Sequence, residues 1–366
     1  MLLFSRCRRI LGVCSLALGV LAGCQSASTP DVLASAEQET LSATSGAPTS
    51  VGTGSARIAL LVDRGAGDYR DGAALAVKEI GGGALSLTVQ EVAGDATAAA
   101  KKAAADGARF FIGSPWLAKA VAAGASGSAV VLLASEPESG GVAIVSDEIG
   151  GLVEVAAYAA GAGRTQIMAV ADQPLSAGQE QRLRNGMKKA GATLVDIVTD
   201  PASPAGKKSL AKLDKVQAVL LIGASAPKVI APILRQGGVL PADVPFLGTG
   251  TWPAASYGEP ALEGSLLALV DQSSLKRIST RFQAAYGRPL SLEAAYAFDA
   301  VAVAAGIVRA KGDQGLTTSA LHAASGFAGA TGVFRFDAEG RAERRFAIYQ
   351  LKRGKPVLLD AAPAGF

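Results

Sequence analysis

Several polar and aromatic residues stand directly after short apolar runs of the sequence. Ser114 and Trp116 follow "RFFIG", and Ser135 follows "AVVLLA". Hydroxyl and carboxylate groups at such positions can hold the charged groups of a small molecule, and aromatic rings can stack on it. We therefore predict a binding site that consists of Tyr69, Ser114, Trp116, Ser135, Asp172, Ser225, Thr249, Thr251 and Trp252.

Each of these residues also has a simpler interpretation. Ser114 precedes Pro115, so its hydroxyl and the neighbouring amides could hold a carboxylate, or the side chain could cap a helix. Asp172 could pair with a ligand ammonium or cap a helix. The two tryptophans could stack on a ligand or pack inside the protein, so the sequence leaves both readings open.

The loop "DRGAGDYRDG" resembles a phosphate-binding turn only in part. Gly65 and Gly67 fit a dinucleotide fingerprint, but the third glycine comes late, at Gly72. The acidic residue that would bind a ribose is poorly matched by Glu91 or Asp95. We expect a loop that faces a binding cleft and contacts no phosphate.

Catalytic and metal-binding patterns are missing from the sequence. His322 is the single histidine, and it follows the last alternating segment, where a triad or a zinc site would be poorly placed. The chain contains no H-E-x-x-H, no G-x-S-x-G and no Walker loop. We expect no enzymatic activity, no metal and no cofactor.

The first residues have the pattern of a secretory signal that ends in a lipidation site. Three arginines precede an apolar run from Ile10 to Ala22, and "LAGC" follows. This tetrapeptide looks like a bacterial lipobox, which predicts a signal peptide over residues 1–23 and acylation of Cys24. A plain signal with a chance cysteine is the alternative.

Cysteine and charge counts restrict the mature chain further. Two of the 3 cysteines fall inside the predicted signal, so no disulfide can form. The formal charge of +4 falls to about +1 without the three signal arginines, which argues against a nucleic-acid partner. Residues 24–55 are rich in Ser, Thr, Ala and Gly and contain no aromatic residue, so we predict a flexible tether.

From Ala56 onward, β-rich apolar runs alternate with Ala-rich segments. We predict strands at 56–62, 85–92, 109–113, 129–134 and 142–146, with helices starting near Gly72, Asp95 and Pro115. A second series of the same kind begins at Thr165. Alternation of this type builds parallel sheets covered by helices on both faces, so two series predict two α/β lobes, each a doubly wound Rossmann-like unit.

The final third departs from the alternation. Residues 273–287 and 290–312 read as successive helices that return to the first lobe, and we assign Tyr296, Phe298 and Asp299 to packing and capping. Residues 331–359 read as a hairpin or a small meander with a turn at "DAEG".

This order resembles the type I periplasmic binding protein fold, in particular the leucine-binding (branched-chain amino acid receptor) family. The likeness rests on "RIALLVDRGAGDYRDGAALAVKEI", "ARFFIGSPW", "AAYAFDAVAVAAGIVRA" and "GFAGATGVFRFDAEGRAERRFAIYQLKRGK". It implies three crossover strands, near 146–149, 270–273 and 329–331, with the ligand between the lobes. Lobe 1 would comprise residues 56–148 plus 271–329, and lobe 2 would comprise 149–270 plus 330–359.

The stretch "SEPES" departs from the family pattern. In amino acid receptors the corresponding strand is followed by Ser or Ala and then by Thr, which grip the ligand carboxylate. Here Ser135 can still donate, but Glu136 and Glu138 bring negative charge to that place. This argues for a different ligand, cationic or a peptide or amide, or for a loop that points elsewhere.

The resemblance implies a lipid-anchored, periplasmic solute receptor that presents a small polar ligand to the permease of an ABC-type importer. The related penicillin-binding protein activators, lipoproteins that regulate a peptidoglycan synthase, are the alternative. Gln25 stands where many Gram-negative lipoproteins retained at the inner membrane have Asp, which favours the outer membrane.

Overall fold

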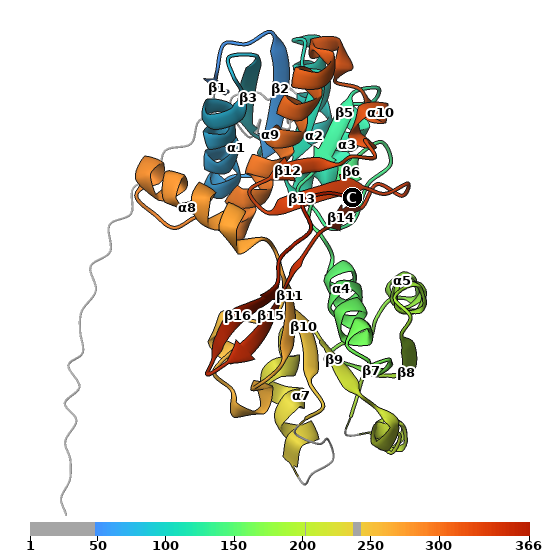
Figure 1. The fold of residues 1–366 in the computed structure, drawn as a ribbon. Coiled ribbons are helices and arrows are strands. Elements are labelled where there is room, and N and C mark those ends of the chain that lie inside the picture. Colours follow the sequence, from blue (N-terminus) through green and yellow to red (C-terminus); the bar gives the residue numbers. More distant parts are fainter. Residues whose placement is uncertain (1–47, 202, 237–242) are drawn as a thin grey trace, which may run out of the picture. The chain divides into compact units, whose positions relative to one another are not determined.

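The computed structural model describes residues 48–201, 203–236 and 243–366. Within these ranges the chain forms two α/β lobes, each built on its own sheet (Figure 1). The predicted signal peptide, Cys24 and the tether up to residue 47 lie outside the described residues. No helix within the described ranges combines the length and the apolar character needed to cross a bilayer.

The first lobe contains a six-stranded sheet in the order β1-β3-β2-β4-β5-β6. Every pairing is parallel except that of β1 with β3. The carboxyl ends of the parallel strands therefore meet at one edge. The strands are β1 (Thr49–Val51), β2 (Ala56–Val62), β3 (Leu85–Glu91), β4 (Phe110–Gly113), β5 (Ala129–Leu132) and β6 (Val142–Ala143).

Strand β1 lies in the segment that we predicted to be tether. It pairs antiparallel with β3, and Gly54 N donates to Leu85 O at 3.1 Å just after it. Gly54 also lies against the chain before β3, since a Cβ there would stand 1.9 Å from the Ala84 carbonyl carbon. The segment from 49 to 55 is thus part of the folded lobe, because an unpaired sheet edge was available to it.

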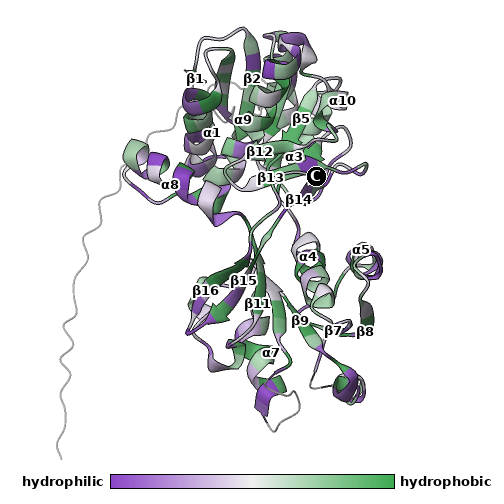
Figure 2. Cartoon of the chain, in the orientation of Figure 1, coloured by the Kyte–Doolittle hydropathy of each residue, from purple (hydrophilic) through white to green (hydrophobic). Residues whose placement is uncertain are grey.

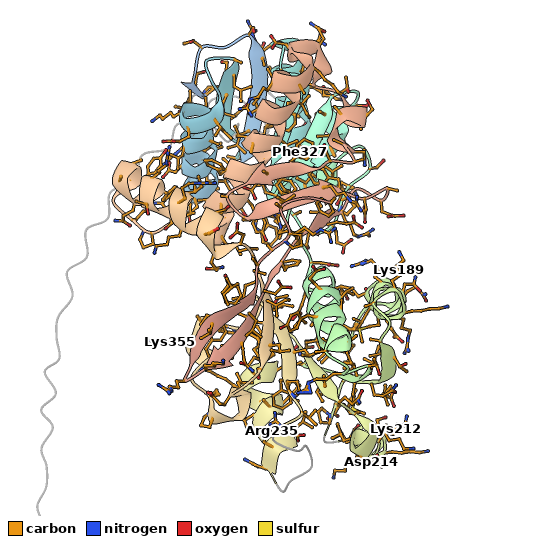
Figure 3. The ribbon with its side chains drawn as sticks, in the orientation of Figure 1. Lys189, Lys212, Asp214, Arg235, Phe327 and Lys355 are labelled. Carbon is orange, nitrogen blue, oxygen red and sulfur yellow. The ribbon has the colours of Figure 1, made fainter. Side chains whose placement is uncertain are left out.

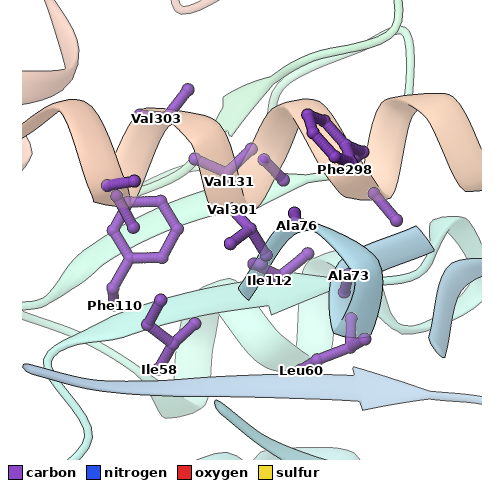
Figure 4. Close-up of a cluster of buried hydrophobic side chains, with 14 of the residues drawn as sticks. Ile58, Leu60, Ala73, Ala76, Phe110, Ile112, Val131, Phe298, Val301 and Val303 are labelled. Atoms are coloured by element: carbon purple, nitrogen blue, oxygen red, sulfur yellow. The ribbon is translucent and has the colours of Figure 1, made fainter. Parts of the chain in front are cut away.

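Helices cover both faces of this sheet, as the alternating side chains of β2 require. Ile58 and Leu60 pack against the face covered by α1 (Gly67–Ile80), α8 (Gln272–Tyr286) and α9 (Leu292–Lys311). Figure 4 shows them with Phe298 and Val301 of α9. Ala59 and Leu61 face α2 (Ala96–Ala105) and α3 (Ala118–Gly124). The short α10 (Thr318–Leu321) joins the same core as α8 and α9.

Helix α1 begins at Gly67, one turn earlier than expected. The expected start, Gly72, serves instead as the contact point of two helices. A Cβ at Gly72 would lie 2.0 Å from the carbonyl oxygen of Ala294 in α9. The third glycine of the loop is therefore explained by close helix packing.

The second lobe contains a seven-stranded sheet in the order β16-β15-β11-β10-β9-β7-β8. Strands β7 to β11 are parallel, whereas β15 and β16 run antiparallel at one side. The strands are β7 (Gln166–Ala171), β8 (Thr193–Val198), β9 (Ala218–Ile222), β10 (Phe246–Thr249), β11 (Leu266–Leu269), β15 (Ala347–Lys352) and β16 (Lys355–Asp360).

Two helices cover each face of this sheet. One core lies under α4 (Glu148–Gly161) and α5 (Ala177–Lys189), and the other lies under α6 (Pro204–Leu210) and α7 (Ala226–Arg235). Figure 2 shows apolar strands within both lobes, with hydrophilic residues mainly on the helices. The side chains of Lys189 and Lys355 extend away from the second lobe (Figure 3). Short 3-10 turns are η1 (Pro115–Leu117), η2 (Leu213–Lys215), η4 (Ala254–Ser256), η5 (Pro260–Leu262) and η6 (Asp313–Gly315).

A third, small sheet consists of β12 (Phe327–Gly329), β13 (Gly332–Phe336) and β14 (Ala342–Arg344). Phe334 and Phe336 are buried in the core of the first lobe. We expected the third crossing at 329–331, but the chain leaves the first lobe only between β14 and β15. The phenylalanine cluster explains the difference, because it can be buried only against the first lobe. The hairpin turn is where it was predicted, with Gly340 N donating to Asp337 O at 3.1 Å.

Candidate functional site

A cavity of about 490 Å³ lies in the first lobe at the carboxyl ends of its strands. Open α/β sheets place ligands at this edge. The loop after β5 contributes Ser135 and Glu138, and the start of α9 contributes Leu292 and Glu293. A neighbouring cavity shares Tyr69 and Glu293 with it and is also lined by Arg70 and Arg288. Two further cavities lie next to α10 and next to the C-terminal segment.

Two tyrosine rings line the cavity. Tyr69, from the first turn of α1, was predicted as a site residue, whereas Tyr296 of α9 was assigned to packing. Burial raises the pKa of the Tyr69 hydroxyl, and Glu293, Asp63 and Asp68 raise it further. Of these acids, Glu293 lines the same cavity as the Tyr69 ring.

Three glutamates line the same cavity, and only one of them is neutralised by a neighbour. Glu136 Oε2 accepts from Arg341 Nη2 at 2.9 Å and from Nε at 3.2 Å. Within the described ranges, neither Glu138 nor Glu293 takes part in an ion pair. The "SEPES" loop therefore does point toward the cavity and brings negative charge to it.

Ser114 has a partner inside the protein. Its side chain is fully buried, and Oγ donates to Asp63 Oδ1 at 2.7 Å. Ser114 is the N-cap residue of η1, but its side chain makes no capping bond there, because its hydroxyl is bound to Asp63. The hydroxyl instead fixes the loop after β2, and Asp63 adds another carboxylate behind the cavity.

Trp116 lies apart from the cavity lining. Its side chain is 88% exposed, and the cavity wall at this point is formed by Pro115 and Ala118. The structure thus brings Tyr69 and Ser135 together in the cavity lining of the first lobe. Ser114 is buried and Trp116 is exposed, and neither lines the cavity.

In the second lobe, Asp172 and Ser225 meet at the carboxyl ends of β7 and β9. Asp172 Oδ2 accepts from Ser225 N at 2.8 Å and from Ser225 Oγ at 2.6 Å. Gly223 between them has a φ of +101°, and a Cβ there would lie 1.9 Å from Asp172 Oδ1. A glycine is therefore required at 223 for the carboxylate to hold this position.

Glu148 joins the same edge and was missed by the sequence analysis. Its Oε1 accepts from Gly223 N at 3.2 Å and from Thr249 Oγ1 at 3.3 Å. Burial raises the pKa of the Glu148 carboxyl, and Asp172 adds to the rise. Its position in the first turn of α4, at the predicted first crossing, was the signal that could have identified it.

Thr251 and Trp252, predicted together, have different environments. Thr251 is exposed, and its N donates to Thr249 Oγ1 at 3.2 Å. Trp252 is only 1% exposed, and its Nε1 donates to Leu221 O at 3.0 Å. Its ring occupies the space over Gly248, where a Cβ would come within 2.2 Å of it. Trp252 is a core residue, so its ring is not available to a ligand.

His322 is exposed, and its Nδ1 lies 3.0 Å from the carbonyl oxygen of Asp337 in the β13–β14 hairpin.

Asp299 caps the turn between β12 and β13, as expected, since Asp299 Oδ1 accepts from Ala330 N at 2.5 Å. In the described part of the chain, no three His, Cys, Asp or Glu residues are grouped closely enough to hold a metal ion.

Comparison with solved structures gives the same fold. A Rhodospirillum rubrum protein, described as a branched-chain amino acid ABC transporter, is 19% identical, with a TM-score of 0.68 over 83% of this chain and 99% of that one. A Desulfitobacterium hafniense ABC transporter substrate-binding protein in complex with Leu is 19% identical, with a TM-score of 0.57 over 83% and 99%. A solute binding protein from R. palustris in complex with benzoate is 18% identical, with a TM-score of 0.51 over 85% and 98%.

No curated protein matched the chain by sequence. A family described as "Periplasmic binding protein" matches residues 57–356, which is most of the chain. The match begins in β2 and ends in β16, so it spans both lobes. The family match agrees with the resemblance to periplasmic binding proteins drawn from the sequence, and so with a binding role. The chain belongs to the periplasmic binding protein family.

Proposed function

We propose that this protein is the extracytoplasmic solute receptor of an ABC-type importer and that it binds a small polar ligand between its two lobes. The observation that carries the proposal is the cavity at the strand ends of the first lobe. Its volume, about 490 Å³, lies within the range of roughly 300–1,000 Å³ that is common for small-molecule sites. The Leu and benzoate complexes of similarly folded proteins support a ligand of this size.

The proposed mechanism is closure of the lobes on the ligand. Asp172, Glu148 and Thr249 lie at the carboxyl edge of the second sheet, the edge that corresponds to the cavity edge of the first. A ligand that contacts both edges binds the closed form more tightly than the open form. Such differential affinity is what shifts the population toward closure.

The proposal includes anchoring to a membrane through acylated Cys24, with a tether that ends near residue 48. A lipid and a flexible tether would hold the receptor at the membrane surface and still let it turn. Gln25 favours the periplasmic face of the outer membrane.

A second candidate is a penicillin-binding protein activator that regulates a peptidoglycan synthase. The "SEPES" loop favours it, because Glu136 is held by Arg341 and stands where amino acid receptors grip a carboxylate. In that case a surface of the two lobes contacts the synthase, and the lobes do not need to close on a ligand.

A thermal-shift screen of the mature chain tests the proposal. The panel contains amino acids, amino acid amides, amines, small peptides and cell-wall fragments. A ligand that binds only the native state raises the melting temperature, so the receptor predicts at least one clear hit and co-purification with a permease. A panel without any hit, together with recovery of a peptidoglycan synthase in a pull-down, would replace the receptor with the activator.

A further inference from the structure

The charged residues that line the cavity of the first lobe are all acidic. Three of its lining residues are glutamates, and none of the described residues that line it is Lys, Arg or His. Glu136 is already paired with Arg341, which leaves Glu138 and Glu293 as the two carboxylates open to a ligand. A ligand carboxylate placed here would meet like charge on two sides.

Two arginines near the cavity are engaged within the protein. Arg288, next to Glu293, binds Asp68 and Asp71. Arg344 lies behind the Tyr296 ring, with its guanidinium carbon 5.3 Å from the ring centroid, and is bonded to Thr331 and to Ile144 O. Both guanidinium groups therefore have acidic or polar partners in the protein, and neither is free to hold an anionic ligand.

The donor that could have gripped a carboxylate is engaged too. Ser114 Oγ donates to Asp63 at 2.7 Å and is fully buried. Among the predicted first-lobe hydroxyls this leaves those of Ser135 and Tyr69, and both residues line the cavity. Neutral hydroxyls do not offset the charge of two unpaired carboxylates.

The remaining walls suit the apolar body of a cation. The rings of Tyr69 and Tyr296 and the side chains of Leu133 and Leu292 line the same cavity. Aromatic faces attract ammonium and guanidinium groups, and carboxylates neutralise them. The second lobe adds an independent acidic edge with Asp172 and Glu148.

We infer that the ligand is a small organic cation, an amine or guanidine with a short apolar body and no free carboxylate, held by Glu138 and Glu293 beside the two tyrosine rings. The inference rests on the proposed receptor function and narrows its ligand. It separates this protein from the Leu and benzoate complexes of its structural relatives, whose ligands both carry a carboxylate.

Calorimetric titration of the mature chain with two matched pairs of compounds tests the inference. Leucinamide and leucine share a side chain and an ammonium and differ in the carboxylate, whereas benzylamine and benzoate share a ring and differ in charge. We expect at least one of the two cations to bind, at least tenfold more tightly than its carboxylate counterpart.

Variants test the two glutamates. Glu138→Gln and Glu293→Gln should each weaken binding of the cation about fivefold to tenfold. Glu180→Gln is the matched control, because Glu180 pairs with Arg184 on the outside of α5 and the substitution removes the same charge. It should leave the affinity unchanged. Equal weakening by all three variants would mean that only the net charge matters, and would overturn the assignment of the site.

The outcomes separate the inference from the proposed function. If leucine or benzoate binds more tightly than its cationic partner, the inference is wrong and the receptor function stands. If neither pair binds and the wider thermal-shift panel also gives no hit, the inference falls together with the receptor function.

Discussion

Asp299 and Arg344 form an ion pair in which neither side chain is exposed, with 3.5 Å between Asp299 Oδ2 and Arg344 Nη1. Asp299 belongs to α9 and Arg344 ends β14, directly before the chain passes to the second lobe. Arg344 Nε also donates to Ser146 Oγ at 3.0 Å, at the first crossing. The pair therefore holds two of the three connections between the lobes, the one at Ser146 and the one after Arg344, against the core of the first lobe.

Replacement of Arg344 should destabilise the protein strongly. Arg344→Met keeps an apolar side chain beside the rings of Tyr296 and Phe334 but removes the guanidinium over them and leaves the Asp299 carboxylate buried without a cation. Breaking a buried pair in this way costs about 3–5 kcal/mol, which urea unfolding at pH 8 would measure. The exposed pair Arg335–Glu343 is the control, and Arg335→Met should cost about 1 kcal/mol or less. An equal loss of unfolding free energy in the two variants would show that the buried pair stabilises the protein no more than the exposed pair does.

The pH dependence of stability should also depend on Asp299. Burial raises the pKa of Asp299 to about 6, although Arg344 opposes the rise. Because the folded-state pKa lies above the unfolded value, the contribution of this group to stability is full below about pH 4 and is lost as the pH rises through 6. The free energy of unfolding of the wild type should therefore fall, relative to that of Asp299→Asn, between pH 4.5 and pH 8. A constant difference between the two proteins across this range would contradict the assignment.

The two tryptophans should differ sharply in accessibility. The chain contains 2 Trp, so Trp116→Phe and Trp252→Phe each leave a single emitter. Trp116, at 88% exposure, should emit at longer wavelength and be quenched readily by acrylamide, whereas Trp252, at 1% exposure, should resist quenching. Similar quenching of both variants would show that Trp252 is not packed in the core.

The acidic edge of the second lobe depends on Gly223. Gly223→Ala places a methyl group 1.9 Å from Asp172 Oδ1 at a φ of +101°, so it should displace the Asp172 side chain and weaken ligand binding. Gly250→Ala, whose new methyl group would be 3.8 Å from Leu269, is the matched control. Calorimetry with the best-binding cation should show at least a fivefold loss for the first and little change for the second. A wild-type affinity for Gly223→Ala would remove Asp172 from the proposed site.

Membrane attachment should require Cys24. In Cys24→Ser the thiol that would be acylated is missing, so the protein should move from the detergent-extracted membrane fraction to the soluble periplasmic fraction. Fractionation with immunodetection measures this. Retention of the variant in the membrane fraction would exclude the lipid anchor.

The fold could be predicted because its signals are local and repeated. Strand-length apolar runs and Ala-rich segments alternate in the sequence, and β2 and β4 lie where the alternation placed them. The third crossing was misplaced because its position depends on where Phe334 and Phe336 find a core, which is a long-range property. Strand β1 was missed for the same reason, since its only partner is the edge of β3.

The candidate site could be predicted by its place but not by the role of each side chain. Tyr69 and Ser135 do line the cavity because residues after parallel strands share one edge. Ser114 and Trp252 follow strands too, yet one hydroxyl binds Asp63 and one ring fills the space over Gly248. Side-chain direction at a strand end depends on the neighbours brought there by folding, and these lie up to 51 positions away for Ser114.

The most direct measurement is small-angle scattering from the mature protein with and without a bound solute. A receptor that closes on its ligand must become more compact when the ligand is present, because the closed form is the one that the ligand binds more tightly. We expect the radius of gyration to fall on addition of the cation that binds best in calorimetry, and the same fall in Glu293→Gln to need about fivefold to tenfold more of that cation. Saturation of the wild type without any change in the radius of gyration would contradict the account.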